Sequence, residues 1–200
     1  MLIEYSSRPV VETTPGPYVP DLLEQVMLGT LTVFAIRAGG AEPDELWDAT
    51  LQQAEALELN TARRTFKFSR HEDVNTDDRA LPDDIGLHMD IMPTQPSLVR
   101  SIRIHQLLQG GYSARFFEIA PEYTEPTKAH YNPDHLPEGT YANYCAGQVD
   151  PGVLMPECRE MTAQAGDIAV FRMSGQRPLA HDFRTTALPR LFRIITLDLP

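Results

Sequence analysis

The stretch that decides the fold is GDIAVFRMSGQRPLAHDFRTTALPRLFRIITLDL, residues 166–199. A Gly-Asp turn opens an apolar strand, and a hairpin leads from it into a second strand that carries His181. A short connection then precedes a last strand, which Arg190 and Arg193 open. The C-terminal third therefore predicts short antiparallel strands joined by turns.

The pattern continues upstream, where Gly, Pro and Asp clusters separate further strand-like runs. In one of them Ile102 and Ile104 alternate with Arg103 and His105, which predicts a half-buried strand with its polar groups on one face. Gln109-Gly110-Gly111 predicts a hairpin after it. The predicted strands are RTFKFS (64–69), IGLHMDI (85–91), SLVRSIRIHQLL (97–108) and YSARFFEIA (112–120).

The first 64 residues predict a flanking strand and helix. LTVFAIRA (31–38) is β-branched and apolar, as in a buried strand. Residues 42–64 have apolar side chains at helical spacing, with Asp44 as a possible cap, and predict the one helix. A single mainly β (α+β) domain over 1–200 follows, a sandwich or jelly roll with the helix packed outside. The Pro- and Tyr-rich stretch 120–165 is poorly periodic and predicts an insertion or lid.

Composition restricts the class of partner. The 200 residues carry 17 Lys plus Arg against 28 Asp plus Glu, a net charge of −11, which argues against a nucleic-acid binder. No segment approaches the roughly 18 apolar residues of a membrane span, and the first residues do not have the pattern expected of a secretion signal. Cys145 and Cys158 are too few for a disulfide scaffold. We therefore expect a cytoplasmic protein with reduced thiols.

The sharpest chemical pattern is His88-Met89-Asp90, inside an apolar run. On a strand, positions i and i+2 project to one face, so His88 and Asp90 could bind one metal ion together. The acidic composition makes such pairs common by chance, and His71-Glu72-Asp73 is a second example. That copy lies in a polar run that predicts a solvated loop, whereas a carboxylate on an apolar strand is costly unless it is paired or metal-bound.

Together with His181 on the penultimate strand and the arginines that open the last one, this pattern resembles the iron(II)/2-oxoglutarate-dependent oxygenases with a double-stranded β-helix core. The resemblance covers roughly residues 65–200. It implies a jelly-roll core there, preceded by the flanking strand and helix, and it implies Fe(II), 2-oxoglutarate and O2 as cofactor and cosubstrates.

The resemblance also implies roles for single residues. His88, Asp90 and His181 would be the catalytic metal ligands, a facial triad that leaves positions open on iron. A last-strand arginine would bind the distal carboxylate of 2-oxoglutarate, because a guanidinium matches a carboxylate with two hydrogen bonds. Arg193 is preferred, since RIITLDL most resembles the family's final strand, and Arg190 is the alternative. His105, with Arg103 or Gln106, is a further candidate contact to the cosubstrate or substrate.

The implied reaction is oxidation of a small molecule, with release of succinate and CO2. The acidic residue at position 90 favours hydroxylation or desaturation over halogenation, for which the family has a small residue there. Two alternatives stay open. One is a non-haem iron oxidase that needs no 2-oxoglutarate, and the other is a metal-free jelly-roll binding protein.

Overall fold

The structure is a computed structural model that describes residues 5–16, 19–57, 60–67, 84–88, 101–120, 131–132, 148–149, 151–174 and 179–198. In these ranges the chain is mainly β, with two helices. In chain order the elements are β1 (Ser6–Pro9), β2 (Val11–Thr13), α1 (Val19–Leu28), β3 (Val33–Ile36), α2 (Pro43–Ala56), β4 (Asn60–Lys67), β5 (Asp84–His88), β6 (Ser101–Ile119), β7 (Tyr131–Asn132), β8 (Gln148–Val149), a 3₁₀ turn (Pro151–Val153), β9 (Leu154–Gln164), β10 (Ile168–Ser174) and β11 (Leu179–Asp198).

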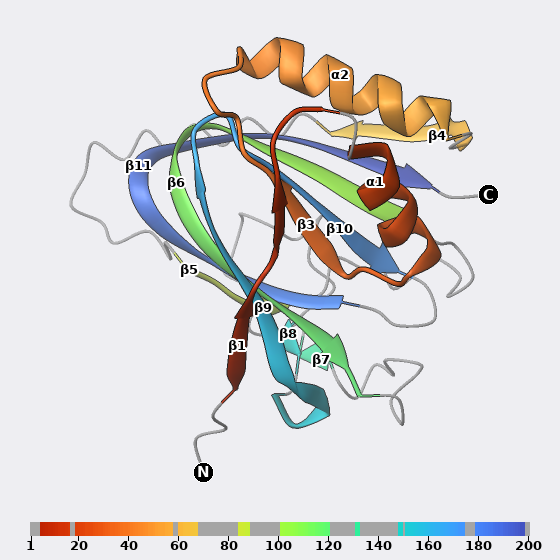
Figure 1. Ribbon diagram of the computed structural model, residues 1–200. Helices are drawn as coiled ribbons and strands as arrows, with labels where there is room; N and C mark the ends of the chain where they lie inside the picture. The colour runs from red at the N-terminus through yellow and green to blue at the C-terminus, as the bar shows by residue number, and fades with distance from the viewer. Residues whose placement is uncertain are drawn as a thin grey trace.

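Two long, strongly curved strands, β6 and β11, organise the sheet (Figure 1). They pair antiparallel from Leu179 opposite Glu118 to Asp198 opposite Ser101, with register shifts between Thr185 and Phe192. The predicted hairpin at Gln109-Gly110-Gly111 and the predicted break before Arg190 are therefore wrong, because both strands continue through these points. The glycines serve to bend β6 instead: Gly110 has a φ of 85°, a conformation that glycine adopts at little cost.

The other strands extend this pair into a nearly closed, barrel-like sheet, as in a double-stranded β-helix. The hydrogen-bonded path runs β2-β3-β10-β6-β11-β5-β8-β7, with β4 on β11 and β9 on β6. Residues 154–164 had been predicted as part of the insertion, but they form β9, which pairs antiparallel with β6.

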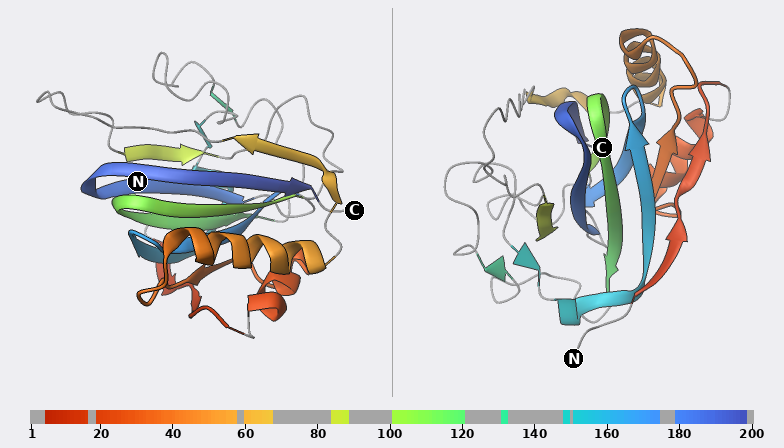
Figure 2. Two further views of the ribbon diagram at one scale, coloured as in Figure 1. Left: turned by 90° about the horizontal axis from the view of Figure 1, so that it is seen from above. Right: turned by 90° about the vertical axis from the view of Figure 1, so that its left-hand side faces the viewer.

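The described residues form three buried apolar clusters, and the sheet separates the two larger ones. One is the barrel interior, which contains strand residues and Val10, the residue between β1 and β2. Its members are Val10, Val33, Ala35, Leu107, Tyr112, Ala114, Phe116, Met161, Ala163, Ala169, Phe171, Leu179, Phe183 and Phe192. The other, here called the helix layer, lies between the sheet and both helices (Figure 2). Its fully buried members include Leu23 and Val26 of α1, Ala54 of α2 and Ile104 of β6. β6 is thus buried on both faces, because His105 on its other face is only 4% exposed, which corrects the half-buried strand expected there.

The helices differ from expectation in the bounds of α2, which was predicted over residues 42–64, and in the presence of α1. α2 begins at Pro43 with Glu42 at the N-cap, so Asp44 lies in the first turn and does not cap. It ends at Ala56, and residues 60–67 pair with β11 instead of continuing the helix. α1 was not predicted, because the prolines around it suggested turns, yet Pro20 lies in the first helical turn, where its missing N–H costs no hydrogen bond. No helix in the described ranges is long and apolar enough to cross a bilayer.

Candidate functional site

His181 lies deep in the barrel interior. It is 1% exposed and is enclosed by aromatic rings, with centroid distances of 5.0 Å to Phe183, 5.3 Å to Phe171 and 6.0 Å to Phe116. On the neighbouring strand β5, the residue directly opposite His181 is His88. The backbone register thus brings two of the three predicted metal ligands to adjacent strands.

The third predicted ligand, Asp90, and the side chain of His88 lie outside the described part of the chain. Within that part, no three His, Cys, Asp or Glu side chains come together. The carboxylate next to His181 in sequence, Asp182, faces the outside of the barrel. There it accepts hydrogen bonds from Nε and Nη2 of Arg115. Asp182 therefore does not share the interior with His181.

Arg190 places a positive charge inside the barrel. Its side chain is 2% exposed, and its guanidinium carbon lies 5.0 Å from the centroid of the Phe192 ring. Nε and Nη1 have no hydrogen-bond partner among the described residues. A buried guanidinium whose donors are unused is costly, so this arrangement favours an anionic ligand.

Tyr112 contributes a second buried polar group near the same charge. Its hydroxyl also lacks a hydrogen-bond partner among the described residues. Burial raises the pKa of the phenol well above its usual range, the charge of Asp167 raises it further, and the charges of Arg37 and Arg190 oppose these shifts. The phenol therefore keeps its proton and can donate a hydrogen bond to an anion.

His105 packs against three aromatic rings of the barrel interior. Its ring stacks on Tyr112 with centroids 5.5 Å apart, and it contacts the rings of Phe192 at 4.4 Å and Phe183 at 5.6 Å. The predicted alternation within β6 is confirmed here, because Gln106 faces the helix layer. Gln106 donates hydrogen bonds to the carbonyls of Pro43 and Gly166, so His105 is the member of that pair that faces the interior.

Arg193 faces away from the barrel interior. Its guanidinium lies 5.0 Å from the Trp47 ring centroid, and it donates hydrogen bonds of 2.6 Å to Gln106 and to Asp44. All these partners belong to β6 or α2. Of the two arginines that the sequence offers for the cosubstrate, Arg190 thus faces the barrel interior and Arg193, the preferred one, faces α2.

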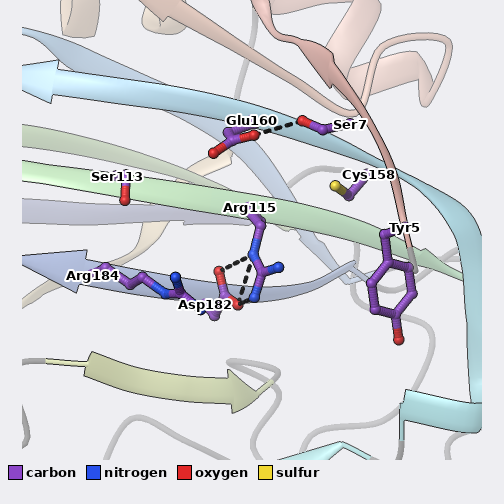
Figure 3. Close-up of a pocket in the computed structure, with 8 residues that line it drawn as sticks. All are labelled: Tyr5, Ser7, Ser113, Arg115, Cys158, Glu160, Asp182 and Arg184. Atoms are coloured by element: carbon purple, nitrogen blue, oxygen red, sulfur yellow. Dashed lines mark hydrogen bonds and ion pairs between the residues drawn. The ribbon is translucent and has the colours of Figure 1, made fainter. Parts of the chain in front are cut away.

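A separate polar pocket of about 230 Å³ opens on the outside of the sheet (Figure 3). The Arg115–Asp182 ion pair occupies its centre, with Arg184 toward one end and Tyr5 toward the other. Its other lining residues are Ser7, Ser113, Cys158 and Glu160. None of the predicted site residues lines it, so the candidate site is the barrel interior.

Sequence reasoning missed Tyr112. The signal was present in YSARFFEIA, where Tyr112, Ala114 and Phe116 alternate with the polar Ser113 and Arg115. That alternation indicates which face is apolar. A tyrosine on that face beside a buried arginine is a candidate hydrogen-bond donor to a ligand.

The sequence matches no protein-family model, and no curated protein matches it. Solved structures similar to this chain include the following three. A taurine dioxygenase from Burkholderia xenovorans has 13% identity and a TM-score of 0.45, over 99% of this chain and 88% of its own. A putative alpha-ketoglutarate-dependent taurine dioxygenase from the same organism has 12% identity and a TM-score of 0.41, over 99% and 92%. The non-heme iron oxygenase OrfP, in complex with Fe, succinate and (3R,4R)-dihydroxy-L-Arg, has 13% identity and a TM-score of 0.40, over 91% and 79%.

Proposed function

We propose that the protein is an iron(II)/2-oxoglutarate-dependent oxygenase that hydroxylates or desaturates a small molecule, with release of succinate and CO2. One observation carries the proposal: Arg190 buries a guanidinium with unused donors in the interior that also contains His181. An imidazole and a cation in one enclosed space suit a ligand that binds a metal at one end and carries a negative charge at the other.

Arg190 and Tyr112 would bind the distal carboxylate of 2-oxoglutarate. A guanidinium presents two parallel N–H groups to a carboxylate, and such charge-assisted hydrogen bonds are roughly twice as strong as neutral ones. The Tyr112 hydroxyl remains protonated because its pKa is raised, so it supplies a further donor. The negative charge would in turn compensate the buried cation.

His88, Asp90 and His181 would hold the iron. Residues directly opposite in an antiparallel pair share a face of the sheet, with Cβ atoms about 4.5–5.5 Å apart, and this register joins positions 88 and 181. Two imidazoles and one carboxylate are a donor set suited to iron(II). Bound iron(II) would supply the activation of dioxygen and its coupling to oxidative decarboxylation of the cosubstrate.

The aromatic residues around His181 would hold the site in place. Phe116, Phe171 and Phe183 contact the imidazole ring, restrict its rotation and keep water from that side. A ligand held in a fixed orientation needs less reorganisation before reaction. The interior of the barrel would thus orient cosubstrate and metal ligands on a rigid framework.

Ligand binding tests the proposal directly. The protein is reconstituted anaerobically with Fe(II) and titrated with 2-oxoglutarate, and the metal-to-ligand charge-transfer band is followed. We expect saturable binding in the native protein, and a loss of at least tenfold in 2-oxoglutarate affinity in Arg190→Met with Mn(II) affinity unchanged. Arg184→Met is the matched control, because Arg184 lies on the same strand but is exposed and lines the outer pocket.

The alternatives give different results. Stoichiometric metal binding without any 2-oxoglutarate band would support an iron oxidase that uses the substrate itself as a ligand. No stoichiometric binding of iron, manganese or cobalt would support a metal-free binding protein. Either result would overturn the proposed function, as would full succinate-forming turnover by His181→Ala with 2-oxoglutarate and a candidate substrate.

A further inference from the structure

The two arginines of the last strand are separated by a change of face within β11. Phe183 and Phe192 both face the barrel interior, although regular alternation would place an odd and an even position on opposite faces. The face therefore switches between them. A regular strand counted from His181 would direct Arg193 inward, whereas the observed strand directs Arg190 inward.

The backbone pairing explains where the switch occurs. Along β6 and β11 the register shifts between Thr185 and Ala187, between Ala187 and Leu191, and again between Leu191 and Phe192. From Phe192 to Asp198 the pairing is regular. Among the described strands, the other edge of β11 pairs with β5 up to Arg184 and with β4 from Ile194 onward. Among the described residues, the section from Thr185 to Leu191, which contains Arg190, therefore pairs only with β6 and irregularly, whereas Arg193 lies just inside the regular section.

Arg193 lies at the start of the regular section and is held there by side chains. It is paired with Gln106 in the backbone register. Its Nε donates a hydrogen bond of 2.6 Å to Gln106, and its Nη2 donates one of 2.6 Å to Asp44, whose carboxylate is exposed. Gln106 is itself fixed by the carbonyls of Pro43 at 2.9 Å and Gly166 at 3.2 Å. The network joins β11, β6, the first turn of α2 and the turn before β10.

We propose that Arg193 is a positioning residue: its bonds to Gln106 and Asp44 fix the register of β11 in which Arg190 enters the barrel. A slip of one residue moves every side chain of a strand to the other face. The face of Arg190 therefore depends on where the regular pairing begins, and the side-chain bonds of Arg193 hold that point. This inference rests on the proposed function, because Arg190 is taken as the carboxylate-binding residue.

The test compares three variants in 2-oxoglutarate and metal binding. In Arg193→Met the Kd for 2-oxoglutarate, measured calorimetrically with Mn(II) under anaerobic conditions, should rise about tenfold while the Kd for Mn(II) stays unchanged. Arg193→Lys should give an intermediate rise, because an ammonium group can pair with Asp44 but does not reproduce the planar arrangement in which Nε bonds Gln106 while Nη2 bonds Asp44. Val26→Ala, which removes a fully buried side chain of the same helix layer from α1, should lower the melting temperature and leave both constants unchanged.

Fluorescence gives a readout without any ligand. Trp47 is the single tryptophan of the chain, and its ring packs against the guanidinium of Arg193. Its emission should therefore change in Arg193→Met and remain native-like in Val26→Ala.

The outcomes separate this inference from the proposed function. An unchanged 2-oxoglutarate Kd in Arg193→Met, or an equal change in Val26→Ala, would overturn the positioning role. Complete loss of binding in Arg193→Met with retention in Arg190→Met would show that Arg193 binds the carboxylate itself. If the native protein binds no 2-oxoglutarate, the proposed function fails, and the positioning role fails with it.

Discussion

At the scale of the residue, neighbours in sequence serve different sides of the barrel. His181 is enclosed by interior aromatic rings, while the next residue, Asp182, bonds Arg115 on the outside. Because side chains alternate along a strand, one step along β11 separates a candidate metal ligand from a structural ion pair. Polarity in the sequence alone does not distinguish the two.

The hydroxyl of Tyr112 is predicted to strengthen 2-oxoglutarate binding and not to stabilise the fold. Tyr112→Phe should weaken 2-oxoglutarate binding about tenfold or more, because a hydrogen bond to a charged group contributes ~1.5–3 kcal/mol. The melting temperature without ligand should stay unchanged or rise, since the hydroxyl has no partner among the described residues. Calorimetric titration and thermal unfolding measure both effects. A lower melting temperature with unchanged affinity would refute the role.

Cys158 is predicted to be unreactive in the folded protein. Its side chain is buried, and that burial raises the pKa of the thiol above its ordinary value. The thiolate is the reacting form, so a raised pKa leaves less of it at pH 8. Iodoacetamide labelling followed by peptide mass spectrometry should show slow modification of Cys158 in buffer and rapid modification in urea. Equal rates in the two conditions would contradict the assignment.

At the scale of the element, the existence of strands was predictable but their continuity was not. Residues 31–38 contain β3, as their β-branched composition indicates. Gly110-Gly111, by contrast, has the same signature whether a chain reverses or a long strand bends, and only pairing with β11 decides for the bend. Periodicity predicts helix up to residue 64, yet residues 60–67 form β4, whose partner is again β11. These errors share one cause, which is that long-range pairing overrides local preference.

The turn between β9 and β10 gives a prediction at this scale. Gly166 has a φ of 94°, and an added Cβ would lie 2.8 Å from Cβ of Ala38. Gly40 has a φ of 89° but open space around it, so it isolates the backbone cost. Gly40→Ala should destabilise by about 1–2 kcal/mol. Gly166→Ala should lose a further ~1–3 kcal/mol from overpacking.

Urea unfolding of both variants measures the difference. The change should appear in the midpoint, with the slope of the transition retained. Equal midpoints for the two variants would show that the segment after β3 yields to the added methyl group, and would argue against a rigid turn beneath Gln106.

At the scale of the whole molecule, the order of motifs along the chain predicts a strand that carries His181, and that strand places His181 in the barrel interior. The metal ligand set stays a prediction, because Asp90 and the side chain of His88 lie outside the described residues. Which of Arg190 and Arg193 faces the interior could not be predicted, because it depends on register shifts that no local pattern encodes. Tyr112 likewise could not be identified as a candidate ligand contact from the sequence, because its position beside His105 and near the charge of Arg190 depends on the fold.

The negative overall charge of the chain opposes the binding of a dianion such as 2-oxoglutarate. The chain carries a net charge of −11, which repels 2-oxoglutarate at long range, although screening limits this repulsion to within about 8 Å of the surface at physiological ionic strength. Inside the barrel, Arg190 and a bound divalent metal would act at short range and at a lower dielectric constant, where their attraction for the dianion is stronger than in water. Metal and cosubstrate should therefore bind cooperatively, since each lowers the electrostatic cost of the other.

Thermal unfolding tests that coupling on the intact protein. At a ligand concentration of 100 Kd, binding to the folded state alone stabilises by about 2.7 kcal/mol, or roughly 5–10 °C for a chain of this length. With Mn(II) present, 2-oxoglutarate should raise the melting temperature by that amount. Without metal the same concentration should raise it much less, and Arg190→Met should reduce the rise with Mn(II) to about half or less. An equal rise with and without metal would mean that the dicarboxylate binds the arginine alone and that the metal and anion sites are independent.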